Sequence, residues 1–260
     1  MKRMIKVWWL LTMSSAKIAF ESRFGVTLFM LGKVLRFVFF MFFLVLLLFR
    51  TKSLAGYPFW TVILFYLTFN FLDTLAQLLF RNVYRFNYSI SSGEFDYDLI
   101  RPVSPLMVNL LGGTDPLDTP MLFVFLGGII LCFSHMGPLS IFNIILYIVL
   151  LCNGFLIATS FHIFVLALGI LTTAVDNTIM LYRDITQMGR LPVDIYKDPL
   201  RSIITFVVPV GIMMTFPVKV LTGLLSFQLI VIALVVGMLF FSLSVLCWKY
   251  ALRQYASASS

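Results

Sequence analysis

The chain has 260 residues, of which 61% are hydrophobic and 12% are charged, and its mean hydropathy is +1.02. A soluble domain of this size cannot bury so much apolar surface, and the apolar residues come in long blocks, so the composition excludes a soluble globular protein. The net charge of +8 comes from basic residues scattered between those blocks, without a run of five or more, which argues against nucleic-acid binding.

Residues 1–30 predict a helix that lies along the inner surface of the membrane. Only about five apolar residues stand between Lys6 and Thr12, fewer than the roughly 7–15 of a signal-peptide core, so we expect the segment to stay on the chain. Lysines are interspersed there with Trp and Leu, as in amphipathic helices that bind at the level of the headgroups.

Six apolar segments predict membrane-spanning helices, because a span needs about 20 mostly apolar residues. They are residues 34–49, 59–80, 117–136, 141–171, 203–216 and 225–248. The first reaches full length if Lys33, Arg36 and Arg50 extend to the membrane surfaces. The fifth contains Pro209 and ends before Pro217, which predicts a kinked or re-entrant segment. We therefore expect one all-α polytopic membrane domain over residues 1–260.

The distribution of Lys and Arg predicts the orientation. If both termini lie in the cytoplasm, sixteen basic residues fall on that side and three, Arg50, Lys52 and Lys219, fall outside. Because cytoplasmic loops are enriched in Lys and Arg, this orientation is the expected one. The loops at residues 81–116 and 172–202 then face the cytoplasm, where a soluble partner would meet the chain.

The second apolar segment carries polar residues on one face. Asn70, Asp73, Gln77 and Arg81 follow one another at intervals of three, four and four residues, which places them on one side of a helix. An ionised carboxylate inside a bilayer costs about 2.5–3.5 kcal/mol, so Asp73 must face protein or water. Two interpretations stay open: Asn70, Asp73 and Gln77 bond to neighbouring helices, or they line a substrate path.

The loop at residues 81–116 predicts a short helix of its own. Gly93 ends the preceding helix, and Glu94 and Asp96 follow it in what would be a new first turn. Pro102 and Pro105 then end this helix, because a residue before proline avoids the helical region. Such an element could dock into a groove on a partner, or it could be an ordinary connection.

The sequence contains no recognisable catalytic or metal-binding motif. The two histidines, His135 and His162, lie in different apolar segments, and no His, Cys or Asp residues have metal-ligand spacing. No glycine-rich phosphate-binding loop of the Gly-x4-Gly-Lys-Ser/Thr type occurs. We therefore expect no metal, no cofactor and no enzymatic activity, and ATP-driven work would need a second polypeptide.

Two motifs resemble those of a known family. Residues 93–106 begin Gly-Glu-Phe-Asp and end Leu-Ile-Arg-Pro-Val-Ser-Pro-Leu, and residues 191–196 read Leu-Pro-Val-Asp-Ile-Tyr. Together with the order of the apolar segments, they resemble bacterial ABC transporter permeases of the type-2 exporter class. The residues that match the family's ATPase-coupling loop are Gly93, Glu94, Phe95, Asp96, Arg101, Pro102 and Pro105. Those that match its second signature are Pro192, Tyr196 and Arg201. Asp98 makes the first loop more acidic than the family pattern.

The resemblance implies a pair of six-helix permeases, identical or paralogous, with two cytoplasmic ATP-binding subunits in the inner (plasma) membrane of a bacterium. ATP binding would close the ATPases, and the short cytoplasmic helices would pass this motion to the substrate path. The alternative function is a secondary transporter or channel that works without an ATPase. It would predict inverted repeats with ionisable pairs near the midplane of the membrane. The sequence shows no such repeat, and Asp73 is the only candidate for an ionisable residue of this kind. The sequence does not name the substrate.

Overall fold

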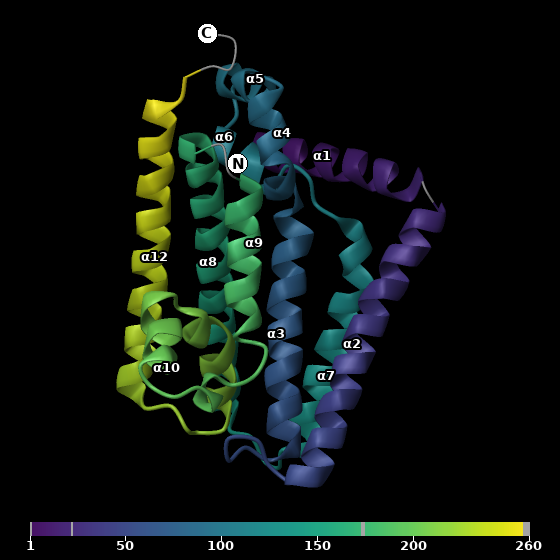
Figure 1. Cartoon of the computed structure of the whole chain (residues 1–260), viewed down its shortest axis with the longest axis vertical. Helices are drawn as coiled ribbons and strands as arrows, with labels where there is room; N and C mark the ends of the chain where they lie inside the picture. The colour runs from purple at the N-terminus through teal and green to yellow at the C-terminus, as the bar shows by residue number, and fades with distance from the viewer. Residues whose placement is uncertain (1, 22, 173–174, 257–260) are drawn as a thin grey trace.

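The computed structural model describes residues 2–21, 23–172 and 175–256, and within these ranges the regular secondary structure is helical throughout. Five described helices are long and apolar enough to cross a bilayer, and they run along the long axis of the molecule (Figure 1). They are α2 (Arg23–Thr51), α3 (Phe59–Leu79), α7 (Thr119–His135), α8 (Ile141–Thr172) and α12 (Phe227–Gln254). The predicted all-α polytopic membrane fold is confirmed.

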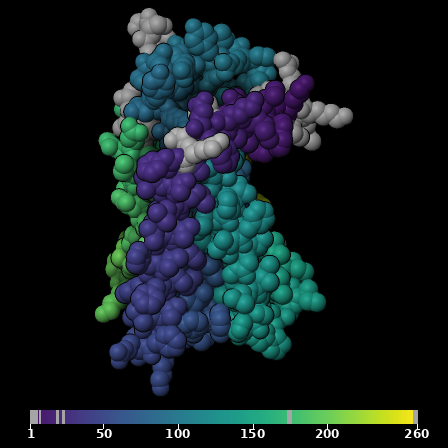
Figure 2. Space-filling model, turned by 90° about the vertical axis from the view of Figure 1, so that its right-hand side faces the viewer, coloured from purple at the N-terminus to yellow at the C-terminus, as the bar shows by residue number. Residues whose placement is uncertain are grey.

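The first helix, α1 (Lys2–Glu21), lies across one end of the bundle. Figure 2 shows it beneath the short helices at that end and above the surface formed by α2 and α7. Thr12 of α1 donates a hydrogen bond to Thr114 over an Oγ1–Oγ1 distance of 3.1 Å. Because α2 begins at Arg23, residues 23–30 belong to the first long helix, and the predicted N-terminal segment is shorter than residues 1–30.

Three short helices project from the same end of the bundle as α1 and the end of α12 (Figure 1). They follow a 3₁₀ turn at Arg81–Arg85 and are α4 (Phe86–Ser91), α5 (Glu94–Ile100) and α6 (Pro105–Leu111). We call Phe86–Leu111 the coupling segment, after the role that its sequence implies. It occupies the middle of the loop predicted at residues 81–116.

The second predicted cytoplasmic loop, residues 172–202, begins at that end but does not stay there. Helix α9 (Val175–Gln187) runs back along α8, where the ring of Tyr182 lies 5.2 Å from that of Phe161. The chain after it reaches the opposite end of the bundle. There Asp194 accepts a hydrogen bond from Tyr57, in the α2–α3 connection, over 2.9 Å. The prediction that both loops lie on one side is therefore wrong for the part after α9.

Hydropathy missed α9 because polar residues interrupt its apolar ones throughout its length. One of its faces is buried through Ile179, Tyr182 and Thr186, and its exposed surface mixes polar side chains with Met180 and Leu181. A helix that packs only one face against protein needs no continuous apolar block. Its 13 residues extend about 20 Å at 1.5 Å per residue, roughly two thirds of a bilayer core. Together with the segment that follows it, α9 leads the chain from one end of the bundle to the other (Figure 1).

The segment from Leu200 to Leu221 is bent at the end of the bundle beyond α9. Its two arms, Leu200–Val207 and Gly211–Leu221, meet at an angle of 80°. The second arm includes α11 (Phe216–Leu221), and α10 is the short turn Leu200–Ser202 that opens the first. The break lies at Val208 and Pro209, where proline cannot donate a backbone hydrogen bond. The predicted kink is confirmed, and the bend gives the segment a re-entrant shape.

Candidate functional site

The coupling segment changes direction at Gly93. This residue has φ = +75°, a conformation that residues with a Cβ rarely adopt, and it separates α4 from α5. Glu94 and Asp96 stand in the first turn of α5, where negative charge favours helix initiation. The predicted acidic helix after Gly93 is therefore present.

Phe95 anchors α5 to the bundle. Its side chain is fully buried, and its ring lies 5.2 Å from Phe86, 5.0 Å from Tyr255 and 6.3 Å from Trp248, between centroids. Burying a phenylalanine stabilises a fold by about 1.5–3 kcal/mol. Since Trp248 belongs to α12 and Tyr255 follows it directly, this contact fixes α5 to the end of a membrane helix.

Polar contacts hold the same helix from within. Asp98 is buried and accepts hydrogen bonds from Arg101 Nη1 at 3.0 Å and from Asn109 Nδ2 at 3.1 Å. Asp96 accepts one from the Tyr255 hydroxyl at 3.0 Å. Asp98, the residue that departs from the family pattern, therefore faces inward and adds nothing to the acidity of the surface. Glu94 remains exposed.

The two prolines of the segment have different roles. Arg101 is extended, with ψ = 144°, and α5 ends before it, as expected for a residue preceding Pro102. Pro105, however, begins α6 and does not end α5, so that part of the prediction is wrong. The reason is that a proline fits the first turn of a helix, where its missing N–H would have no partner.

The outer face of α5 carries large apolar side chains. Tyr97 is 64% exposed and Ile100 is 79% exposed. Glu94, Tyr97 and Ile100 follow one another at intervals of three residues, so their side chains share one face of the helix. Sequence reasoning missed Tyr97 and Ile100. Their spacing was the available signal, because it places them on a different face of the helix from Phe95 and Asp98.

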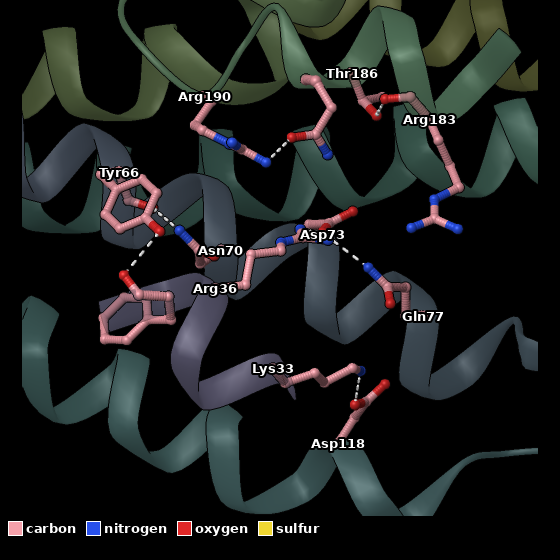
Figure 3. Close-up of polar contacts among 12 residues, drawn as sticks. Lys33, Arg36, Tyr66, Asn70, Asp73, Gln77, Asp118, Arg183, Thr186 and Arg190 are labelled. Atoms are coloured by element: carbon pink, nitrogen blue, oxygen red, sulfur yellow. Dashed lines mark hydrogen bonds and ion pairs between the residues drawn. The ribbon is translucent and has the colours of Figure 1, made fainter. Parts of the chain in front are cut away.

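A second candidate site lies between the membrane helices, around Asp73 (Figure 3). Its carboxylate accepts a hydrogen bond from Gln77 Nε2 at 2.8 Å and lies 3.9 Å from Arg36 Nη2 of α2. Asn70 instead donates to the backbone oxygen of Tyr66 in its own helix, at 2.7 Å. All three predicted residues border one small pocket of about 40 Å³, together with Lys33 and Arg36. The structure thus joins Asp73 and Gln77 and leaves Asn70 bonded locally.

Lys33 and Arg36 turn into the bundle, not toward the headgroups as predicted. Lys33 Nζ forms an ion pair with Asp118 at the start of α7, and the Asp118 side chain is 0% exposed. Arg36 reaches Asp73. Extension to the surface was the expectation because no partner is visible in the sequence. Ionisable side chains within membrane helices usually pair with one another, and here each cation has a carboxylate on a neighbouring helix within reach.

Helix α9 and the turn that follows it add two arginines, Arg183 and Arg190, that sequence reasoning placed in a loop. The Arg190 guanidinium lies 4.7 Å from the ring centroid of Phe40 and 5.6 Å from that of Phe69, and it donates to Gln187. Figure 3 shows Arg183 pointing from α9 toward the side of α3 that carries Asp73. Arg183 and Gln187 stand four residues apart on α9, and this helical spacing was the available signal for Arg183.

The predicted second signature lies at the far end of the bundle. The Tyr196 hydroxyl donates to the backbone oxygen of Met188 at 3.1 Å, and Pro192 precedes a 3₁₀ turn at Val193–Ile195. Arg201 pairs with Asp198, whose pKa is lowered by hydrogen bonds from Ser202 and from Arg201. These contacts are local, so the signature belongs to the turn that follows α9.

Burial, and the hydrogen bond to Asp194, raise the pKa of Tyr57, which keeps its hydroxyl protonated as a donor. Lys219 Nζ also donates to Asp194, at 2.7 Å. Asp194 therefore ties the turn after α9 both to the α2–α3 connection and to the bent segment.

Comparison with known families decides the assignment. The family described as ABC-2 family transporter protein matches residues 34–259. The chain belongs to this family. No curated protein and no solved structure matches the chain. Membership confirms the resemblance to type-2 ABC permeases and makes the chain a multi-pass transport subunit. Among the described residues, no cluster of three or more His, Cys, Asp or Glu side chains could hold a metal ion.

Proposed function

We propose that this ABC-2 permease is the membrane-spanning subunit of an ATP-driven exporter. It works with a second permease copy, identical or paralogous, and with two ATP-binding subunits that carry out hydrolysis. Both termini lie in the cytoplasm of a bacterium whose inner membrane holds the complex. The observation that carries the proposal is the coupling segment, which projects from the end where α1 and the end of α12 lie (Figure 1).

The coupling segment is suited to transmit motion because it is braced on both sides. Phe95 fixes α5 to α12, and Asp98 links α5 to α6 through Asn109. A force applied to α5 therefore moves its neighbours, whereas a floppy loop would absorb it. These contacts support a role for the coupling segment in transmitting motion, and not that of an ordinary connecting loop.

The exposed face of α5 indicates the chemistry of the partner groove. Tyr97 and Ile100 would enter an apolar floor, and Glu94 would meet a basic side chain at the rim. Aromatic and aliphatic anchors with a charged rim are typical of protein interfaces. An ATP-binding subunit with such a groove fits the family of the chain.

The test is co-purification with a co-expressed ATP-binding subunit. The variant E94K/I100E should weaken binding about tenfold or more, because it sets like charges together and places a carboxylate in an apolar groove. Asp96 is left unchanged, since Tyr255 donates to it and its reversal would also disturb the end of α12. The control L224E changes a residue that is also exposed, in the turn between α11 and α12.

Pro102→Gly should act differently. The complex should still assemble, but hydrolysis should continue with reduced transport in proteoliposomes, because the corner between α5 and α6 gains freedom. If E94K/I100E binds the ATPase and transports like the parent, the coupling segment is only a connection.

One observation favours the alternative of transport without an ATPase. The ion pairs Lys33–Asp118 and Arg36–Asp73 lie between membrane helices, as ionisable pairs of secondary transporters do. Substrate movement by the purified chain alone, driven by an ion gradient across vesicles, would support this function.

A further inference from the structure

The cluster in Figure 3 holds more positive than negative charge. Its cations are Lys33, Arg36, Arg183 and Arg190, and its carboxylates are Asp73 and Asp118. Lys33 is paired with Asp118, and Asp73 interacts with Arg36 and Gln77. Within the described part of the chain, no carboxylate forms an ion pair with Arg183 or Arg190.

The excess charge lies deep in the membrane. Helix α3 has 21 residues, so it is about 31 Å long and matches the hydrocarbon core of a bilayer. Phe69 is the middle residue of this helix, and the Arg190 guanidinium packs against its ring. Arg190 therefore lies near the midplane, where an arginine costs about 2.5–3.5 kcal/mol unless something compensates its charge.

The arginines keep donors available for an anion. Within the described residues, Arg190 Nε is buried and has no acceptor. The Arg36 side chain is 52% exposed although it approaches Asp73, and Arg183 is exposed as well. A guanidinium offers donors in a planar fork that matches a phosphate or a carboxylate. The two rings beside Arg190 hold its guanidinium in place through cation–π contact.

The surroundings of the cluster are apolar. Met180 lies three residues before Arg183, on the same face of α9, and its side chain is exposed. Phe40, which is partly buried, packs against Arg190, and Phe69, whose ring also lies beside the guanidinium, is fully buried. A ligand whose anionic group contacts the arginines therefore meets apolar side chains with the rest of its body, which favours an amphiphile over a free inorganic anion.

We propose that Arg36, Arg183 and Arg190 bind the phosphate or carboxylate group of an amphiphilic substrate as it crosses the membrane. This inference rests on the proposed function, because it names the substrate class of the exporter. The site adds to the sequence-based candidates Asn70, Asp73 and Gln77, which stand on α3 in the same cluster, and the carboxylate of Asp73 limits its positive charge.

The test uses the purified permease alone, in dodecyl maltoside, with radiolabelled dodecyl phosphate as the probe. Binding should be saturable. Dodecyltrimethylammonium and inorganic phosphate should compete poorly, since the first has the wrong charge and the second has no apolar chain. Arg183→Gln should weaken binding by about tenfold, because a hydrogen bond between charged groups is lost. Arg190→Lys should weaken it too, since lysine keeps the charge and loses the planar fork.

The matched control is Arg253→Gln, which removes an exposed arginine at the end of α12 and should bind like the parent. Arg183 is exposed, so its replacement should leave the gel-filtration profile unchanged, and a sound profile separates lost binding from misfolding. Parental affinity in Arg183→Gln, or equal competition by inorganic phosphate, would overturn the proposal. A third result would also overturn the proposal: the Arg183→Gln variant elutes as a monomer where the parent elutes as a dimer, yet still binds the probe. Arg183 would then contact a second copy of the chain and not the ligand.

Because no ATPase takes part in this measurement, its outcome is independent of the exporter assignment. Probe binding without ATPase co-purification would refute the coupling role and keep the anion site. Co-purification without probe binding would do the reverse.

Discussion

The ion pair between Lys33 and Asp118 joins α2 to the start of α7, and its two partners are unequally buried. The Asp118 side chain is 0% exposed, whereas 23% of the Lys33 side chain is exposed. Helix α2 otherwise turns most of its surface outward (Figure 2). We therefore expect removal of either partner to loosen α2, and the two removals to differ in cost.

Lys33→Met should be the costlier change. It leaves a buried carboxylate without its cation, and one oxygen of Asp118, Oδ2, already lacks a partner among the described residues. Breaking a buried pair in this way costs about 3–5 kcal/mol. Asp118→Asn should cost about 1–2 kcal/mol, because the amide still accepts a hydrogen bond and the flexible lysine can extend toward water. The combined change K33M/D118L should be close to neutral, as for other buried pairs replaced by apolar residues.

The assay is unfolding of the purified chain in mixed micelles of dodecyl maltoside and sodium dodecyl sulfate, followed by tryptophan fluorescence. Apparent free energies from the single and double variants form a double-mutant cycle. If the double change costs the sum of the two single changes, the charges act independently and Lys33 does not compensate Asp118. Equal costs of the two single changes would contradict the expected asymmetry of burial.

Three further predictions concern topology, coupling and charge. A single cysteine at position 195 should react with an impermeant reagent from the same side as one at position 53, and from the opposite side to one at position 97; labelling of 195 and 97 together would contradict the fold. Phe95→Ala should cost about 3–5 kcal/mol locally and reduce ATPase co-purification, and unchanged co-purification would show that α5 needs no anchor. Asp73→Asn should leave insertion intact and strengthen dodecyl phosphate binding, because it removes a competing negative charge; weaker binding would refute this electrostatic reasoning.

Local signals explain what the sequence could predict. A long apolar block predicts a spanning helix whatever its neighbours, so five spans are present close to their expected places. Gly93 and Pro209 are equally local, because positive φ and a missing N–H act on the backbone at their own positions. The acidic first turn of α5 follows from Gly93 in the same way.

Tertiary contacts explain what the sequence could not predict. Lys33 and Arg36 extend inward because Asp118 and Asp73 stand on other helices within reach, and no spacing along the chain reveals that. Helix α9 escaped hydropathy because it lies against protein, and its absence from the expected spans moved the following residues to the wrong end. One missed helix thus accounts for both the misplaced loop and the missed Arg183 and Arg190.

Helix α9 also connects the two candidate sites. Asn87 of α4 donates a hydrogen bond to Asp176 in the first turn of α9 at 3.0 Å, and α4 and the preceding 3₁₀ turn pack against α9. The helix that begins at the coupling segment therefore carries Arg183 in its third turn and leads to Arg190 near the midplane. Since a helix moves as a rigid body over this length, a shift of α4 imposed by a closing ATPase would displace these arginines relative to Asp73 on α3. Such a displacement changes how strongly an anion is held, and an exporter needs that change in order to release what it binds.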